Sequence, residues 1–237
     1  ASAVLPLCSQ HPGQCGLFPL EKSLDAFAAR YRLAEMAEHT LDVQYYIWES
    51  DMSGLLLFSV LLAAAKRGVR VRLLLDDNNT PGLDDTLRLL DNHPNIEIRL
   101  FNPFSFRILR ALGYLTDFAR LNRRMHNKSY TADGVVTLVG GRNIGDAYLV
   151  QANNRCFPIW MLWLSGRWSR MLQTTLSVTG TAARFQRYKM CLRCPSQILR
   201  SVLSYPNPGI TMILPAAICI SWKPASLCPV SIKDRCR

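Results

Sequence analysis

A histidine, a lysine and an asparagine lie close together in this chain, in an arrangement that could serve phosphate chemistry. His126 and Lys128 are two residues apart, so they would share one face of a β-strand. An Asp-Gly pair at 133–134 favours a hairpin turn, and Val135–Val139 is typical of a second, buried strand. The two strands would bring His126, Lys128 and Asn143 toward one end of a sheet. An imidazole that can attack phosphorus or transfer a proton, an ammonium group and an amide donor suit a phosphodiester.

The complete pattern, His-x-Lys-x-x-x-x-Asp followed by Gly-Gly-x-Asn, resembles the signature of the phospholipase D superfamily. Segments 41–48, 68–77 and 140–146 are similar to the bacterial cardiolipin synthases, most of all to the C-type branch, and the resemblance runs from about Gly16 to about Tyr148. The alternative is a surface strand that carries a stray histidine and lysine. The residues of the pattern are His126, Lys128, Asp133, Gly140, Gly141 and Asn143.

The resemblance implies transphosphatidylation, in which a phosphatidyl group moves between phospholipids through a phosphohistidine intermediate. It implies no metal or other cofactor, because lysine and asparagine side chains hold the phosphate oxygens. His126 would be the nucleophile, and Asp133 would support the loop of the motif. The implied substrate is a phosphatidylglycerol-type lipid, and the implied location is peripheral, at the cytoplasmic face of the bacterial inner membrane. The catalytic set is His126, Lys128 and Asp133, and the phosphate-binding set is Lys128, Asn143, Gly140 and Gly141.

Periodicity predicts an α/β fold around these residues. The predicted strands cover 41–48, 69–76 and 96–101, and the predicted helices cover 20–39, 53–67 and 84–92, with Ser53 as a helix cap and Gly68 as a helix end. This β-α-β-α-β order favours parallel strands with crossover helices. With the hairpin added, we expect a phospholipase D-like mixed sheet flanked by helices, comprising one of the family's two repeats. Asp76 and Asp77 follow a strand, where α/β folds bind ligands, although a turn with solvated carboxylates fits equally well.

The segment that precedes the histidine is basic and amphipathic. Apolar residues of 104–124 are interleaved with arginines, and Asp117 is the single acidic residue. Such a helix can lie in a membrane interface and attract anionic headgroups, whereas the alternative is an ordinary helix packed on the sheet with its arginines in water. The candidate membrane-interface residues are Arg107, Arg110, Arg120 and Arg123.

Charge divides the chain near residue 150. Residues 151–237 hold twelve of the 28 Lys and Arg residues and one of the 17 Asp and Glu residues, so they carry the whole net charge of +11. Six of the eight cysteines and four of the five tryptophans also lie there. The predicted domains are a loose N-terminal segment at 1–19, a catalytic half-domain at 20–150, and a basic tail at 151–237 without a native fold.

The composition of the tail suggests a change of coding frame. Cardiolipin synthases continue with an acidic Asp-Leu-Asp-Val-Met-Ala stretch where this chain has Pro158–Leu164. Trp and Met each have a single codon, so reading from the third base turns the overlap of Trp160 and Met161 into GAT, which encodes aspartate. The next three overlaps permit Val, Met and Ala. We therefore hypothesise a frameshift near Tyr148, with a lineage-specific basic domain as the alternative.

The chain contains a single copy of the His-x-Lys pattern. Its histidines are His11, His39, His93 and His126, so these residues lack the second histidine that the family uses to protonate the leaving alcohol. The chain by itself is therefore expected to be inactive. Two alternatives remain: a single-motif phosphodiesterase or nuclease that is active only as a homodimer, or a non-catalytic fragment that associates with membranes. The neutral charge of residues 1–150 argues against nucleic acid as a partner, because nucleic-acid grooves are basic.

The cysteines do not predict a metal site. Cys191-x-x-Cys194 is a single half-site without a second pair, and the other cysteines are irregularly spaced. We therefore expect no metal, and cysteines that are reduced or incidental in a cytoplasmic setting.

Overall fold

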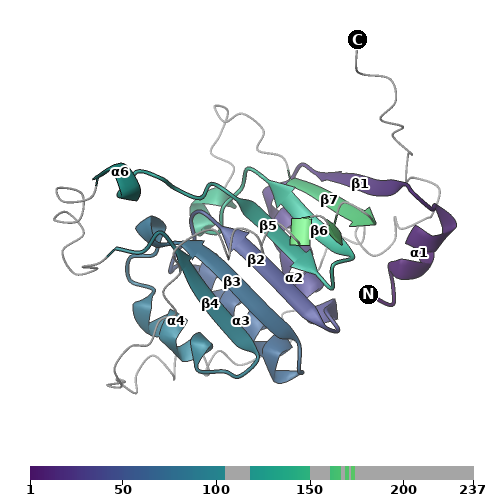
Figure 1. Cartoon of the computed structure of the whole chain (residues 1–237). Coiled ribbons are helices and arrows are strands. Elements are labelled where there is room, and N and C mark those ends of the chain that lie inside the picture. The colour runs from purple at the N-terminus through teal and green to yellow at the C-terminus, as the bar shows by residue number, and fades with distance from the viewer. Residues whose placement is uncertain (105–117, 150–160, 167–168, 171, 174–237) are drawn as a thin grey trace, which may run out of the picture.

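One mixed β-sheet organises the protein (Figure 1). The structure is a computed structural model that describes residues 1–104, 118–149, 161–166, 169–170 and 172–173, with the backbone alone at 119–120. The strand order is β1-β7-β6-β5-β2-β3-β4, in which β2, β3 and β4 are parallel and the other neighbours antiparallel. The strands are β1 (Cys15–Leu20), β2 (Thr40–Tyr45), β3 (Arg70–Asp76), β4 (Ile96–Phe101), β5 (Lys128–Ala132), β6 (Val136–Gly140) and β7 (Met161–Gly166).

Helices α2 (Ser23–Met36) and α3 (Met52–Lys66) pack against each other and lie on one face of the sheet (Figure 1). Helix α4 (Asp84–Asp91) connects β3 to β4 and packs on β4. These helices and strands confirm the predicted β-α-β-α-β order with parallel crossovers. The other described helical segments are α1 (Leu5–Gln10), α6 (Phe118–Leu121) and two 3-10 turns, Asp77–Asn79 and Asp146–Tyr148.

The cap of α3 differs from the prediction, because Asp51 takes the place that was assigned to Ser53. The Asp51 carboxylate accepts a hydrogen bond from the Gly54 amide at 3.0 Å, and the Ser53 hydroxyl donates to the same carboxylate. A carboxylate at this position also interacts favourably with the helix dipole, which explains why it displaces a serine. Gly68 follows the helix with a φ of +96°, as its predicted role at the helix end requires.

The hairpin between β5 and β6 is confirmed. Asp133, Gly134 and Val135 connect the two strands; Asp133 and Gly134 have φ values of +53° and +64°, and the Val135 amide donates to the Ala132 carbonyl oxygen at 3.0 Å. Two successive positive φ values define the type I′ turn that an Asp-Gly pair favours, because this turn matches the twist of antiparallel strands. The turn sets the register in which Ser129 pairs with Val139, so the face on which each β5 side chain lies is also set.

The two faces of the sheet differ in chemistry. Leu41, Val43 and Tyr45 of β2 point into the main hydrophobic core beneath α2 and α3. The intervening residues are polar and form a row across neighbouring strands. Arg72 donates to Asp42 at 2.5 Å, and Thr131, which pairs with Asp42, lies 2.9 Å from the hydroxyl of Thr137.

Two segments that were predicted to be irregular contain strands. Residues 1–19, expected to be loose, include α1 and most of β1, which is an edge strand. Residues 161–166, expected to belong to a tail without a native fold, form β7 between β1 and β6. Residues 161–164 are all apolar, and an apolar extended segment can pair with the open edge of a sheet. Within the described ranges, no helix is long and apolar enough to cross a membrane.

Candidate active site

The candidate active site lies at the C-terminal end of β2, where β5 begins. Lys128 pairs with Tyr45 in the strand register, and it is the first residue of β5. Its ammonium nitrogen lies 3.3 Å from Nδ1 of His126 and donates to the His126 carbonyl oxygen at 3.1 Å. Burial lowers the pKa of Lys128, and the residue is 6% exposed. The structure thus brings His126 and Lys128 together, as their spacing predicted.

The contact with Lys128 determines which nitrogen of His126 carries a proton. An ammonium group can only donate, so Nδ1 accepts and the proton of the neutral imidazole is on Nε2. A nitrogen that accepts a hydrogen bond, or one that carries a proton, cannot attack phosphorus. Attack by either nitrogen therefore requires Lys128 to transfer its hydrogen bond from His126 to a phosphate oxygen, after which the imidazole can change tautomer.

Tyr46 belongs to this site, although the sequence did not single it out. Its ring centroid lies 4.7 Å from that of His126, and the Lys128 ammonium lies 5.3 Å from the centre of the same ring. An aromatic face attracts a cation, so Tyr46 holds the lysine and the histidine on one side. The available signal was the alternation in β2: with Tyr45 in the core, the next residue faces away from it.

Asn143 reaches the same end of β2 from the loop after β6. Its Oδ1 atom accepts a hydrogen bond from the Ile47 amide at 3.3 Å, and Ile144 forms a parallel bridge with Trp48. The Asn143 amide nitrogen makes no hydrogen bond within the part of the chain that the structure describes, so it is available to a phosphate oxygen. Gly140 ends β6, and Gly141 follows it at the exposed start of this loop.

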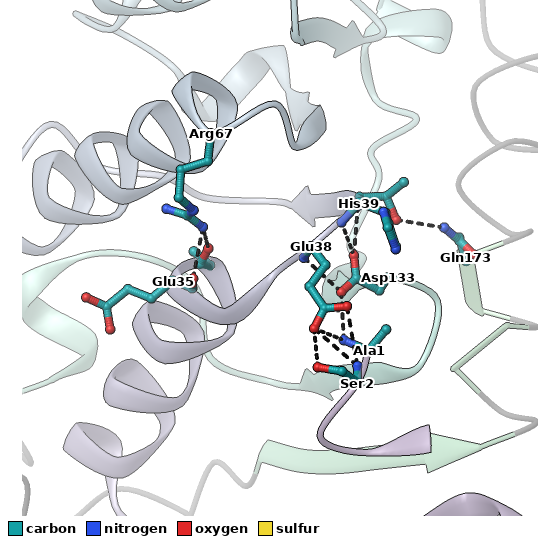
Figure 2. Close-up of polar contacts among 10 residues, drawn as sticks. Ala1, Ser2, Glu35, Glu38, His39, Arg67, Asp133 and Gln173 are labelled. Carbon is teal, nitrogen blue, oxygen red and sulfur yellow. Dashed lines mark hydrogen bonds and ion pairs between the residues drawn. The ribbon is translucent and has the colours of Figure 1, made fainter. Parts of the chain in front are cut away.

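Asp133 lies away from His126 and Lys128, as a residue that supports the loop of the motif would. It lies in the β5–β6 turn, seven residues after His126, and a strand of that length spans about 20 Å. Its carboxylate accepts hydrogen bonds from the backbone amides of Glu38, His39 and Thr40 and from the ammonium group of Ala1 (Figure 2). Burial acts to raise the pKa of Asp133, but these hydrogen bonds prevail and lower it. Asp133 therefore holds the start of β2 against β5.

Asp76 and Asp77 are buried, so a turn with solvated carboxylates is wrong. Asp76 accepts hydrogen bonds from the Met125 amide at 2.9 Å and from the Arg124 guanidinium at 3.2 Å. Asp77 accepts from the Phe104 amide at 2.8 Å. The two carboxylates thus hold both ends of the segment that precedes His126.

The membrane-interface candidates are only partly described. Arg107 and Arg110 lie outside the described residues, and for Arg120 the backbone alone is described. Arg123 is exposed, and its carbonyl oxygen accepts a hydrogen bond from Asn102.

The side chains gathered here are of types that suit phosphate chemistry. An imidazole such as that of His126 can act as a nucleophile, and an ammonium and an amide such as those of Lys128 and Asn143 can donate hydrogen bonds to phosphate oxygens. Within the described part of the chain, His126 has no carboxylate partner, and no group of three metal-binding side chains occurs. Cys191 and Cys194 lie outside the described residues.

Comparison with known sequences matches the region that carries this site. The family model described as "Cardiolipin synthase, PLD-like domain" matches residues 31–160. Cardiolipin synthase C of Escherichia coli (strain K12) is 90% identical over 148 residues, which are 62% of this chain and 31% of that protein. The chain thus spans less than a third of the length of the first curated relatives that it matches.

Solved structures share the fold. Phosphatidylserine synthase of Haemophilus influenzae Rd KW20 is 12% identical with a TM-score of 0.53, over 85% of this chain and 47% of that one. NucT from Helicobacter pylori is 16% identical with a TM-score of 0.50, over 72% of this chain and 97% of that one. At these identities the likeness concerns the fold alone. The predicted phospholipase D-like mixed sheet with helices is confirmed.

Proposed function

Because the chain belongs to the family of phospholipase D-like cardiolipin synthase domains, we propose that it is the half of a phosphatidyltransferase that supplies the nucleophile, His126. The observation that supports this most is the contact of His126 Nδ1 with the Lys128 ammonium, with Asn143 at the same strand end. These groups can bind a phosphodiester and attack it. The substrate class that the family suggests is a phosphatidylglycerol-type lipid.

In the proposed reaction, a phosphate oxygen takes the hydrogen bond that Lys128 now gives to His126. The imidazole then attacks phosphorus, a nitrogen–phosphorus bond forms, and the bond to the leaving alcohol oxygen breaks. Lys128 and the Asn143 amide stabilise the charge on the non-bridging oxygens. The leaving alcohol needs a proton, which the second histidine of a complete family site would give and later recover from the acceptor alcohol.

A substrate with an activated leaving group tests nucleophilic attack by His126 without the need for a second histidine as general acid. Nitrophenolate leaves without a proton, so a short-chain phosphatidyl nitrophenol should release up to one equivalent of nitrophenolate and transfer its phosphatidyl group to His126. The acceptor step lacks its base, so the reaction should stop there. His126→Ala should abolish this burst, and labelled phosphatidylglycerol should give no turnover.

Three outcomes contradict parts of this proposal. If no burst occurs, His126 is not the nucleophile. If the chain forms cardiolipin repeatedly and His126→Ala abolishes it, the chain is not half a site. If a nucleoside nitrophenyl phosphodiester reacts and the lipid does not, the homodimeric phosphodiesterase is correct.

We also propose a peripheral location on the anionic, cytoplasmic face of the inner membrane. Exposed Arg123 and the basic segment of 104–124 support this location. The burst assay then includes a salt series with the lipid in anionic vesicles. Electrostatic attraction predicts a slower burst at high salt, and a salt-independent burst excludes it.

A further inference from the structure

Among the residues that the structure describes, Arg30 is a buried cation without an anionic partner. It lies on α2 with 2% of its surface exposed. Its guanidinium donates to the Tyr45 hydroxyl at 2.7 Å and to the carbonyl oxygens of Ala26 and Arg142 at 2.8 and 3.4 Å. In the described part of the chain Arg30 forms no ion pair, so all of these acceptors are neutral. A charge that is removed from water without a counter-ion destabilises a fold strongly.

The remaining contact of this guanidinium is with β7. Nη2 of Arg30 lies 3.5 Å from the sulfur atom of Met161, which is fully buried. A thioether is a weak acceptor and brings no charge. Arg142 is a neighbour of the same sign, and burial together with the charge of Arg30 lowers the pKa of Arg142. The local charge is therefore positive at the point where Met161 lies.

Met161 is also the position at which the alternative frame encodes an acid. The codons of Trp160 and Met161 are TGG and ATG, and the overlapping codon GAT encodes aspartate whatever the neighbouring codons are. Two of its three bases belong to the Met161 codon. The next overlaps permit Val, Met and Ala, which suit a buried strand. The overlapping codons and the contact between Arg30 and Met161 are independent observations.

We propose that the β7 position belongs to a strand of the alternative reading frame, whose aspartate is the counter-ion of Arg30. Met161 has replaced that aspartate. Arg30 also bonds the carbonyl of Arg142, which precedes Asn143, so the ion pair anchors the start of the phosphate-binding loop. A small anion from solution fits less well, because the guanidinium is almost completely buried. The ion pair does not depend on the proposed phosphatidyl transfer.

The test restores the carboxylate in the existing full chain. Met161→Asp is compared with Met161→Asn, a near-isostere without the charge, by urea unfolding at neutral pH. The cost of burying Arg30 is already present in the unaltered chain, so the new ion pair should raise the folded-to-unfolded ratio about tenfold over Met161→Asn. The difference should disappear when Arg30→Met is added to both variants.

The pH dependence provides a second readout. An aspartate beside Arg30 has a folded pKa below its unfolded value, so its stabilisation is present above the unfolded pKa and is lost as the pH falls through the folded pKa. The proposal is overturned if Met161→Asp is no more stable than Met161→Asn, fails to fold, or keeps its advantage without Arg30. Stabilisation of the unaltered chain by inorganic phosphate that requires Arg30 would assign the position to a small anion instead.

Discussion

The two ends of the β2–β5 strand pair carry residues of one motif but bind them differently. At the C-terminal end of β2, His126 is exposed and Lys128 holds it by one charged contact. At the other end, the Asp133 side chain is 2% exposed and accepts hydrogen bonds from three consecutive backbone amides (Figure 2). The first end would be free to exchange its contact for a phosphate, as the proposed function requires, whereas the second holds two strands together.

The pKa shifts of Asp133 and Lys128 differ in the same way between the two ends. Hydrogen bonds lower the pKa of Asp133 against the opposing effect of burial, so the fold favours the charged form of this carboxylate. Burial lowers the pKa of Lys128, so the fold disfavours its charged form. A cation that is poorly solvated by its own protein is ready to bind an anion. Within one motif, the fold therefore favours the charged form of the aspartate and disfavours that of the lysine, as expected if Asp133 serves stability and Lys128 binds phosphate.

The largest effect that this comparison predicts is for Asp133→Asn. The amide that replaces the carboxylate has one accepting oxygen and no charge, so the amides of residues 38–40 lose their ionic acceptor. We expect the free energy of unfolding in urea at neutral pH to fall by about 2 kcal/mol. His126→Gln is the matched control at the other end, where an exposed substitution should change stability by less than about 0.5 kcal/mol.

The pH dependence of stability in the unaltered chain and in Asp133→Asn tests whether the charge of Asp133 causes the difference. Because the folded pKa of Asp133 is lowered, its stabilisation is present above the ordinary value of 3.8 and is lost as the pH falls through the folded pKa. The unaltered chain and Asp133→Asn should therefore converge in stability at acidic pH. If the two proteins keep the same difference in free energy of unfolding down to acidic pH, the difference is due to the shape of the side chain and not to its charge.

Asp76 allows a second test, because it has a structural role but lies near the candidate active site. It holds Met125 and Arg124, but burial outweighs these hydrogen bonds and raises its pKa. Its carboxylate therefore destabilises the fold as the pH rises through the folded pKa, which offsets what its hydrogen bonds contribute. Asp76→Asn should cost about 1 kcal/mol or less at neutral pH, by the same urea measurement. A loss larger than that of Asp133→Asn would contradict the division.

Local patterns in the sequence predicted most of the fold. The strands, the parallel crossovers and the Asp-Gly hairpin follow from periodicity and turn chemistry within short windows. The cap at Asp51 was missed because three residues near that position can cap a helix, and only the backbone geometry selects one. β1 and β7 were not predicted, because β1 pairs with β7 and β7 with β6, and short windows cannot reveal pairing between distant segments.

The sequence predicted the residue types of the candidate site and part of its geometry. His126 and Lys128 are in contact, as their spacing of two predicted, and the hairpin brings Asn143 to the same end of β2. Asp133 belongs to the same motif, yet it follows the last residue of β5 and so lies at the other end of this strand from His126. Tyr46 and Arg30 make contacts that join distant segments, such as β2 with β5 and α2 with β7, and no sequence spacing encodes these.

Lys128→Met should abolish phosphate binding without destabilising the fold. Methionine has nearly the same length and removes a charge that burial disfavours, so stability at neutral pH should stay the same or rise by up to about 1 kcal/mol. In the unaltered chain this penalty disappears as the pH rises through the folded pKa of Lys128, which lies below the ordinary 10.5, so the two proteins should converge at alkaline pH. Inorganic phosphate should shift the imidazole resonances of His126 in the unaltered chain and leave them unmoved in Lys128→Met, because phosphate displaces the lysine from Nδ1. Destabilisation by more than about 1 kcal/mol would mean that Lys128 is a structural residue like Asp133, and the contrast between the two ends would not hold.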